Sequence, residues 1–347
     1  MTLSGIILKI MNVKISELKR FLEIIAKKYV SEDEAEYYSI ELTEAYIRKY
    51  PRCNILKDEV ISDTERQEKY KDHKIKVIKN FPSLMQLDFN RLPITFKLKW
   101  IHDTLIEKSE KTGIAILGFD NSGGMHTLHT WTQGIAKRGY FALAGYNGGP
   151  LAVVPLKGTR GLLGTNPMSY AFPTNEGEVV VDMATSEIPY FEIKNAKEEG
   201  KKLKNNVAVD SKGHVTTDPN LALDEDEISN LLPIGGNYKG YAINYLIEIM
   251  TGTLISAKLS NKMDPAYVNE EHGGFIIVIN IKAFCDIVTF KSSISEFNKV
   301  IRSQEGVDKT KVIVPGDNNI SKYKNALEKG VVEVEDDFIK KSKELAK

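Results

Sequence analysis

GLLGTNPMSYAFPTNEGEVVVDMATSE, residues 161–187, is the stretch that decides the fold of this chain. Within it, Gly164-Thr165-Asn166-Pro167 has the residue types of a turn beside an apolar segment. Val179-Val180-Val181 is a β-branched run that predicts a strand ending in Asp182-Met183-Ala184-Thr185-Ser186, before an expected helix. Such a strand end places backbone N–H groups and hydroxyls at one edge of a sheet, where anionic and carbonyl groups are commonly bound. The stretch therefore predicts a ligand site at this edge.

The composition excludes several functional classes. The 347 residues carry 47 basic and 47 acidic side chains, so the formal net charge is zero and gives no electrostatic reason to expect nucleic acid or an anionic membrane as partner. No apolar run reaches the length of about 18 residues that a membrane helix needs. Two cysteines, Cys53 and Cys285, form neither a disulfide framework nor a metal set, which favours a cytoplasmic protein with reduced thiols.

Helices and strands alternate on either side of the central stretch. Apolar runs predict strands at 113–118 and 140–146, separated by the turn Asn121-Ser122-Gly123-Gly124 and a helix at 126–138. This β-α-β order favours an α/β sheet. Further helices are expected at 15–25, 32–50, 94–111, 186–199, 239–254, 293–302, 320–329 and 336–346, and a further strand at 275–281.

Two of the expected helices carry informative details. Ser31 and Glu34 have the spacing of a capping box at the start of the second helix. The helix at 239–254 has one apolar face, formed by Ala242, Tyr245, Leu246, Ile249 and Met250. Residues 52–75 are polar and give no assignable pattern. The predicted division is an N-terminal helical part (1–75), a central cofactor-binding α/β domain (76–235) and a C-terminal α/β part (236–347) that packs back on the N-terminal part.

No standard nucleotide fingerprint is present. The run Gly235-Gly236-Asn237-Tyr238-Lys239-Gly240 matches neither G-x-G-x-x-G nor the P-loop pattern. A glycine-rich turn before a helix is commonly structural. The functional alternative rests on Lys239, a cation in the first turn of a helix, where free N–H groups already favour an anion.

Histidines offer one catalytic candidate and no metal site. His126 and His129 lie three residues apart on an expected helix, but a zinc site needs further ligands and no partner has matching spacing. His126 follows the Asn121-Ser122 turn closely, so it is a candidate general acid, with a packed or surface histidine as the alternative. Asp182 is a candidate for orienting a catalytic group or for capping the next helix. The remaining histidines, His73, His102, His214 and His272, have no local context and are treated as structural.

Taken together, several segments resemble the malate/L-lactate dehydrogenase family that lacks the Rossmann fold. That family includes sulfolactate, ureidoglycolate and 2,3-diketogulonate oxidoreductases and the reductases of piperideine- and pyrroline-2-carboxylate. The matching motifs occur in family order over residues 112–335: Asn121-Ser122, Leu163–Pro167, Val181–Ser186, Thr216–Pro219, Leu232–Gly236 with Tyr238–Tyr241, and Val314–Asp317. Each motif alone is weak, whereas the ordered set is specific.

The resemblance implies an NAD(P)-dependent oxidoreductase that acts on a small-molecule carboxylate, either a 2-oxo or 2-hydroxy acid or a cyclic imino acid. It implies a non-Rossmann malate/L-lactate dehydrogenase-like α/β fold with an N-terminal helical part, and a homodimer. By position, the family's cofactor contacts fall on Asn121, Ser122, Thr165, Asn166, Asp182, Met183, Ala184, Thr185, Lys239, Gly240, Pro315, Gly316 and Asp317.

The chain departs from the family at the catalytic residues. The family's general acid/base is the histidine of a Ser-His-Gly motif, with a carboxylate-binding arginine three residues later; this chain has Arg52-Cys53-Asn54, with Lys57 near the arginine position. The family's histidine after Asn-Ser is replaced by Gly124.

Three interpretations follow from these departures. The proton donor is His126 or another group, with Lys57 or Arg52 binding the carboxylate and Asp182 in support; or His73 is the displaced histidine. Alternatively, the protein is a non-catalytic relative that binds a dinucleotide for regulation or complex formation.

Overall fold

A seven-stranded mixed sheet forms the centre of the molecule. The computed structural model describes residues 10–49, 55–123, 125, 127–267 and 269–345. The sheet contains, in spatial order, β2 (Lys76–Asn80), β3 (Leu84–Asp88), β4 (Ile114–Ser122), β10 (His272–Ile279), β5 (Phe141–Tyr146), β6 (Met168–Thr174) and β7 (Gly177–Met183). Only β3 and β4 are parallel neighbours within this sheet; the other neighbouring strands run antiparallel. The predicted α/β class is confirmed.

The order of the sheet depends on a strand that comes late in the chain. β4, α5 (His129–Lys137) and β5 follow one another in sequence, as the β-α-β pattern predicted. However, β10 lies between β4 and β5 and pairs with both. Asn121 and Ser122 were expected in a turn, but they end β4, because Ser122 pairs with His272 at the start of β10. The segment predicted as the C-terminal part thus contributes an inner strand to the central sheet.

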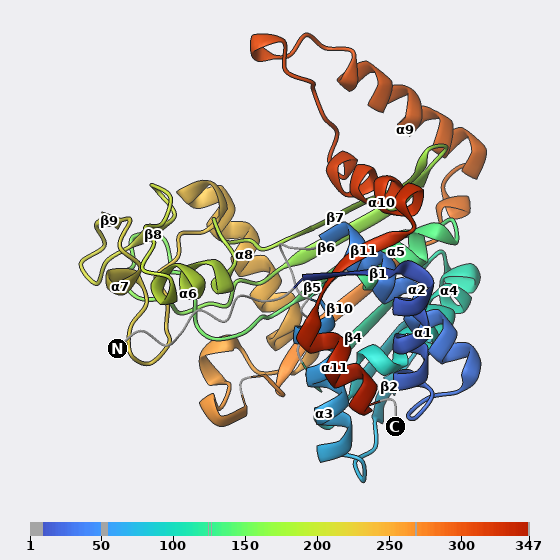
Figure 1. The fold of residues 1–347 in the computed structure, drawn as a ribbon, viewed down its shortest axis with the longest axis horizontal. Coiled ribbons are helices and arrows are strands. Elements are labelled where there is room, and N and C mark those ends of the chain that lie inside the picture. The colour runs from blue at the N-terminus through green and yellow to red at the C-terminus, as the bar shows by residue number, and fades with distance from the viewer. Residues whose placement is uncertain (1–9, 50–54, 124, 126, 268, 346–347) are drawn as a thin grey trace.

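Different helices cover the two faces of the sheet (Figure 1). α4 (Leu98–Thr112) and α5 pack on one face, where Leu105, Trp131 and Ile276 belong to one buried apolar cluster. α8 (Tyr238–Thr251) contacts β5 and β10 on the other face. Gly118 of β4 faces Ile255, which follows α8, and a side chain at position 118 would collide with Ile255.

The first and last strands that the structure describes pair with each other. β1 (Ile10–Lys14) pairs antiparallel with β11 (Val331–Glu335). α1 (Ile15–Ala26) contacts α11 (Asp336–Leu345), and α2 (Glu32–Lys49) contacts α10 (Asp317–Lys329). The remaining helices and strands are α3 (Ser62–Lys69), α6 (Tyr190–Glu198), β8 (Ala208–Val209), β9 (Val215–Thr216), α7 (Pro219–Ala222) and α9 (Ile287–Arg302).

The segment that gave no sequence pattern is helical. A π-helical turn, Leu56–Ile61, leads directly into α3. Its polar residues are buried by tertiary contacts: the Arg66 guanidinium lies 2.7 Å from the Asp63 carboxylate and donates to the Asn269 carbonyl at 3.0 Å. A buried polar face has no apolar periodicity, which explains why the helix was not predicted.

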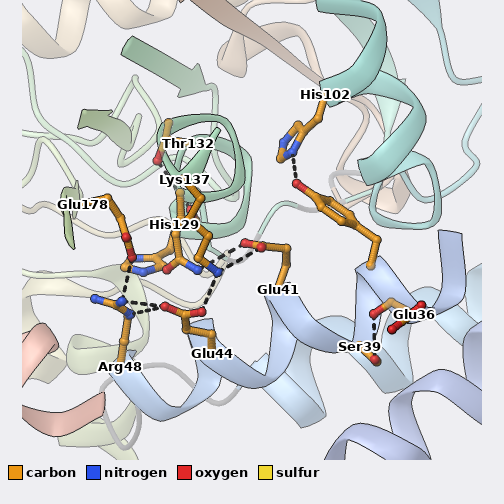
Figure 2. Close-up of polar contacts among 12 residues, drawn as sticks. Glu36, Ser39, Glu41, Glu44, Arg48, His102, His129, Thr132, Lys137 and Glu178 are labelled. Atoms are coloured by element: carbon orange, nitrogen blue, oxygen red, sulfur yellow. Dashed lines mark hydrogen bonds and ion pairs between the residues drawn. The ribbon is translucent and has the colours of Figure 1, made fainter. Parts of the chain in front are cut away.

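A network of buried charges joins α2 to α5 and β7 (Figure 2). Arg48, near the end of α2, donates to Glu44 at 2.5 Å and to Glu178 of β7 at 2.7 Å. Lys137 of α5 donates to Glu41 at 3.0 Å and to Glu44 at 2.5 Å. Removing one partner from such a network leaves an uncompensated buried charge, which is far more costly than losing a surface pair.

The same region contains a buried neutral imidazole. His129, at the start of α5, is fully buried, and burial together with the nearby Lys49 and Arg48 charges lowers its pKa well below the usual range. Burial conversely raises the pKa of the Glu41 carboxyl, against the effect of the Lys137 ammonium. His129 therefore adds no charge to the network near neutral pH.

The described residues contain neither a membrane-spanning helix nor a group of side chains suited to a metal ion. None of their helices is long and apolar enough to cross a membrane. Nor do three or more His, Cys, Asp or Glu side chains among them gather into a group suited to a metal ion.

Arg48→Met should lower the free energy of unfolding by about 3–5 kcal/mol, because Glu178 loses its ion pair with Arg48 and Glu44 keeps its pair with Lys137. Urea denaturation followed by circular dichroism measures this loss. The control is Lys340→Met, which removes a pair between an exposed lysine and Asp336 and should change the stability far less, because water solvates an exposed charge. Similar losses in both variants would contradict the structural role of the network.

Candidate active site

A cleft of about 640 Å³ lies where the ends of four strands meet α2 and α6. Thr165 and Pro167 precede β6, Asp182 and Met183 end β7, Tyr146 ends β5, and His272 begins β10. The other lining residues are Lys49, Met125, Gly148, Gly149, Pro150, Ala184, Ser186, Glu187, Ile188, Pro189, Tyr190, Phe191, Glu192, Lys194, Lys204, Glu227, Ile234 and Asn269.

Asp182 is the centre of the charged wall of this cleft. Its Oδ2 accepts a hydrogen bond from the Thr127 hydroxyl at 2.8 Å and lies 3.1 Å from the Lys49 ammonium. Lys49 also donates to the backbone carbonyl of Asp182 at 3.2 Å. The two charged side chains are 16% and 7% exposed. Because an ammonium has three donors and two are used on Asp182, one N–H of Lys49 is available to a ligand.

The loop with the turn sequence is positioned by buried amide groups of α8. The Asn244 side chain donates to the Gly164 carbonyl at 3.1 Å and to the Thr185 hydroxyl at 2.9 Å. The Asn166 side chain donates to the Glu248 carboxylate at 2.7 Å. A Cβ at Gly164 would lie 2.5 Å from the Gly148 carbonyl oxygen, so only glycine permits this close approach of two loops.

These contacts set the orientation of α8. The sequence analysis identified one apolar face without assigning its surroundings, and two of its residues, Tyr245 and Leu246, are 51% and 54% exposed. The buried side instead includes Asn244 and Glu248, which bond to the loop around Asn166. Tertiary hydrogen bonds outweigh helical amphipathicity here, because an unpaired buried amide or carboxylate is costly.

His272 lies on the cleft wall beside Tyr146. The ring centroids are 4.6 Å apart, and His272 Nδ1 is 2.8 Å from the Asn147 carbonyl oxygen. The carbonyl is only an acceptor, so Nδ1 carries the hydrogen. This contact fixes the ring plane and the tautomer of the neutral imidazole, in which Nε2 carries the lone pair.

The predicted cofactor contacts fall into three groups. Thr165, Asp182, Met183 and Ala184 line the cleft. Asn166 and Thr185 are fully buried behind it, where their side chains bond within the protein. The others lie outside the lining: Asn121 and Ser122 end β4, Lys239 and Gly240 are in the first turn of α8, and Pro315, Gly316 and Asp317 lead into α10.

Contacts of these outlying residues show their local roles. The Asn121 amide donates to Asp88 at 3.1 Å, and Asp317 pairs with Arg302 at 2.7 Å. Gly240 packs so tightly on the carbonyl of Ile234 that a side chain there would collide with it. Since Ile234 lines the cleft, this glycine acts on the cleft through backbone packing.

The predicted catalytic residues are mostly not in the cleft lining. Arg52 and His126 lie outside the described residues. Lys57 is exposed on a separate hollow of about 300 Å³, together with Glu65, Asp337 and Lys341. His73 contacts the Asn90 carbonyl through Nδ1 at 2.7 Å and does not line the cleft.

The sequence analysis did not predict that Lys49 and His272 would line the cleft. Lys49 ends α2, immediately before the segment in which the family's Ser-His-Gly motif was sought, so its position was a usable signal. His272 precedes Gly273-Gly274 and the apolar run of β10, and only the strand's place between β4 and β5 brings it to the cleft.

The cleft suits a nicotinamide dinucleotide in size and in the chemistry of its donors. Its volume falls within the range of about 300–1,000 Å³ typical of cofactor and ligand sites. Lys194 and the exposed Lys204 offer cations for phosphate groups, and Thr165 and Ser186 offer hydroxyls. Tyr146, Met183 and Ile188 offer apolar surface for ring systems.

A mixed sheet with a cleft at its strand ends, and no Rossmann fingerprint, defines a non-Rossmann α/β fold of the dehydrogenase type. The chain belongs to the malate/L-lactate dehydrogenase family, whose model matches residues 13–342. The resemblance inferred from the motifs is confirmed.

Three known proteins illustrate the relationship. Malate/(S)-sulfolactate dehydrogenase of Methanothermus fervidus is 35% identical over 245 residues, which cover 70% of this chain and 69% of that protein. Ureidoglycolate dehydrogenase (NAD(+)) of Escherichia coli is 26% identical and covers 67% of this chain and 66% of its own. The structure of malate dehydrogenase from Entamoeba histolytica superposes with a TM-score of 0.83 over 97% of this chain and 98% of that chain, at 22% identity. The predicted fold is thereby confirmed.

Asp120 gives the end of β4 a pH-dependent stability. Burial raises the pKa of its carboxyl from 3.8 to about 6, although Oδ1 accepts a hydrogen bond from the Asn121 N–H at 2.7 Å. The folded protein therefore binds this proton more tightly than the unfolded chain does. Between pH 4 and pH 6 this group lowers the free energy of unfolding as pH rises, and the loss is complete above pH 6.

Asp120→Asn removes this titration but retains an oxygen acceptor. Relative to wild type, the variant should become more stable by about 1–3 kcal/mol as pH rises from 4 to 7, as measured by urea denaturation at each pH. The control variant, Asp210→Asn, should change in the opposite direction. Backbone N–H donors lower the pKa of Asp210, so this variant should lose stability relative to wild type as pH rises. A pH-independent difference for Asp120→Asn would refute the assignment.

Proposed function

We propose that this protein is an NAD(P)-dependent oxidoreductase that transfers a hydride between nicotinamide and a 2-oxo or 2-hydroxy acid, with cyclic imino acids as the other substrate class. The observation that carries the proposal is the composition of one cleft wall. Thr165 and Asp182, from two separate family motifs, line the same cleft as Lys49. A cation beside a protein carboxylate, next to apolar surface, suits a small substrate with an acid group.

Lys49 is the group we assign to the substrate carboxylate. Its orientation is set by two contacts with Asp182, so little side-chain freedom is lost when the remaining N–H binds a ligand. The lysine is also less exposed than Lys194, and a charge-assisted bond is stronger away from water. Lys57, predicted for this role from the sequence, lies on the separate hollow.

The dinucleotide would lie along the wall formed by Thr165, Met183 and Ala184, with its phosphates near Lys194 and Lys204. Bound nicotinamide supplies or accepts the hydride. Lys49 orients the substrate through its acid group, and Thr127 and Lys49 together hold the Asp182 carboxylate in place. The apolar residues of the cleft exclude water from the reacting carbon.

Fluorescence titration of the wild type with NADH and NADPH, followed by turnover of oxaloacetate, pyruvate and cyclic imino acids, tests the proposal. Lys49→Gln should raise KM for the accepted substrate about 10- to 100-fold, the equivalent of one lost charge-assisted bond, with less effect on dinucleotide affinity. Lys49→Arg keeps the charge and should show a smaller rise. Lys341→Gln, on the separate hollow, is the control.

Each failure has a distinct meaning. If neither dinucleotide binds to folded wild type, the proposal is wrong. If a dinucleotide binds but no substrate is turned over, the non-catalytic relative is the correct interpretation. If Lys57→Gln raises KM and Lys49→Gln does not, the carboxylate belongs to Lys57.

We also propose a homodimer that buries the outer face of α8. Tyr245 and Leu246 on this helix are large apolar side chains in contact with solvent in the single chain. Leu254, just after the helix, extends this surface. Contiguous exposed apolar surface is typical of protein–protein contacts. Because α8 packs on β5 and β10 through its other side, a partner on this face would also stabilise the cleft.

Light scattering coupled to size-exclusion chromatography should give twice the 38.9 kDa mass of one chain. Leu246→Glu should shift the mass to that of a monomer, because a charge would be buried in the contact. The matched control is Val77→Glu, an equally exposed apolar site on the edge strand β2. A dimer that persists in Leu246→Glu and dissociates in Val77→Glu would place the contact at β2 instead.

A further inference from the structure

We propose that His272 is the catalytic acid and base of the cleft, a role that rests on the oxidoreductase function proposed above. The family's histidine motif is absent from the sequence, and His272 is outside every motif that carries the resemblance. The proposal comes from the position of this side chain in the cleft wall and from the contacts that orient its ring.

Asn147 fixes the start of β10 from two sides. Its carbonyl oxygen accepts from His272 Nδ1 at 2.8 Å. Its side-chain oxygen accepts from the Gly273 N–H at 2.7 Å, and its own N–H donates to the Gly273 carbonyl at 3.1 Å. A histidine whose Nδ1–H is bonded to a carbonyl has a fixed ring plane and a fixed tautomer, the arrangement that a general base needs.

The location of the ring limits its contact with water. His272 is 1% exposed, yet it is part of the cleft lining with Tyr146 and Asn269. Tyr146 covers part of the ring at 4.6 Å between centroids. A small molecule in the cleft therefore meets the ring where bulk solvent has little access, which favours directed proton transfer to the substrate.

The other histidines that the structure describes are elsewhere. His102 and His129 are fully buried, and burial lowers the pKa of His102 to about 3 and that of His129 well below its usual range. His73 bonds to the Asn90 carbonyl, and His214 is exposed next to Asp210. Within the described part of the lining, His272 is the sole imidazole.

Several charged groups on the elements around His272 form ion pairs. On α3, Arg66 pairs with Asp63 and donates to the carbonyl of Asn269. Glu271, the preceding residue, pairs with Lys258 at 2.5 Å and with Arg91 at 3.4 Å. On the charged wall of the cleft, Lys49 pairs with Asp182. Two further carboxyl groups lie on neighbouring elements: Glu59 is buried on the turn before α3, and Asp120 lies near the end of β4.

The proton and electron balance is complete with the proposed reactants. In reduction, the substrate carbonyl carbon receives a hydride from dihydronicotinamide, and the carbonyl π pair moves to oxygen. That oxygen takes the proton from Nε2 of the imidazolium. The products are the hydroxy acid, oxidised nicotinamide and neutral His272; in the oxidation direction, neutral Nε2 removes the hydroxyl proton.

The decisive variant is His272→Asn. The asparagine amide can replace the Nδ1–H bond to the Asn147 carbonyl, while Nε2 is lost. With oxaloacetate and NADH or NADPH, kcat should fall about 10²- to 10⁴-fold, and dinucleotide affinity from fluorescence titration should change little. The limb of the kcat/KM pH profile that belongs to the histidine should disappear. His214→Asn, at an exposed site, is the matched control.

A second readout does not depend on turnover. In protein labelled with ¹³C at histidine Cε1, the NMR signal missing from His272→Asn identifies His272, and this signal should titrate between pH 5 and pH 9. A signal that does not titrate in this range would overturn the proposal.

The kinetic outcomes separate this inference from the proposed function. A loss of kcat with an unchanged pH profile would show a structural role and overturn the inference. So would full turnover by His272→Asn, which leaves the oxidoreductase function intact. A wild type that binds dinucleotide but turns over neither oxaloacetate nor malate would overturn the acid–base role. A wild type that binds no dinucleotide would refute the proposed function itself.

Discussion

The buried ion pairs of Arg48 determine where α2 lies against the sheet. Arg48 contacts Glu178 on β7, and the next residue, Lys49, contacts Asp182 on the same strand. Glu178 and Asp182 are four residues apart, so both side chains project from one face of β7. Because buried charges require partners with defined geometry, the end of α2 has a defined register on β7. Arg48 thus fixes the position of the end of α2 on β7. The next residue, Lys49, is thereby held in the cleft lining, where it can contact a ligand.

A second set of polar contacts determines where the loop around Thr165 lies. Asn244 and Glu248 of α8 are buried and bond to the loop that contains Gly164 and Asn166. The energetic requirement to pair these groups sets the orientation of α8 and leaves two residues of its apolar face, Tyr245 and Leu246, exposed. One orientation of a helix thus has two consequences: it positions Thr165 at the cleft, and it exposes Tyr245 and Leu246 to solvent. The site and the proposed subunit contact are coupled through this helix.

Membership of the family does not by itself identify the residue that exchanges a proton in this chain. The motifs that form the sheet edge are retained, whereas the histidine of the family's Ser-His-Gly motif is not. An oxidoreductase of this type needs a group that exchanges a proton near neutral pH, but the strand that supplies the group is not dictated by the fold. β10 begins at the cleft, and the acid–base role proposed for His272 rests on this position at the start of the strand.

The sequence by itself determined the elements whose signals are local. Helical periodicity predicted α1 and α4, the Ser31–Glu34 spacing predicted the box at the start of α2, in which Glu34 accepts from the Ser31 N–H, and the ordered motifs determined the family. Only the tertiary structure decided that β10 lies between β4 and β5, that α8 buries its polar side, and that Lys49 and His272 line one cleft. The physical reason is that these features depend on hydrogen bonds and ion pairs between residues far apart in the chain, and the periodicity of a single segment contains no information about such partners.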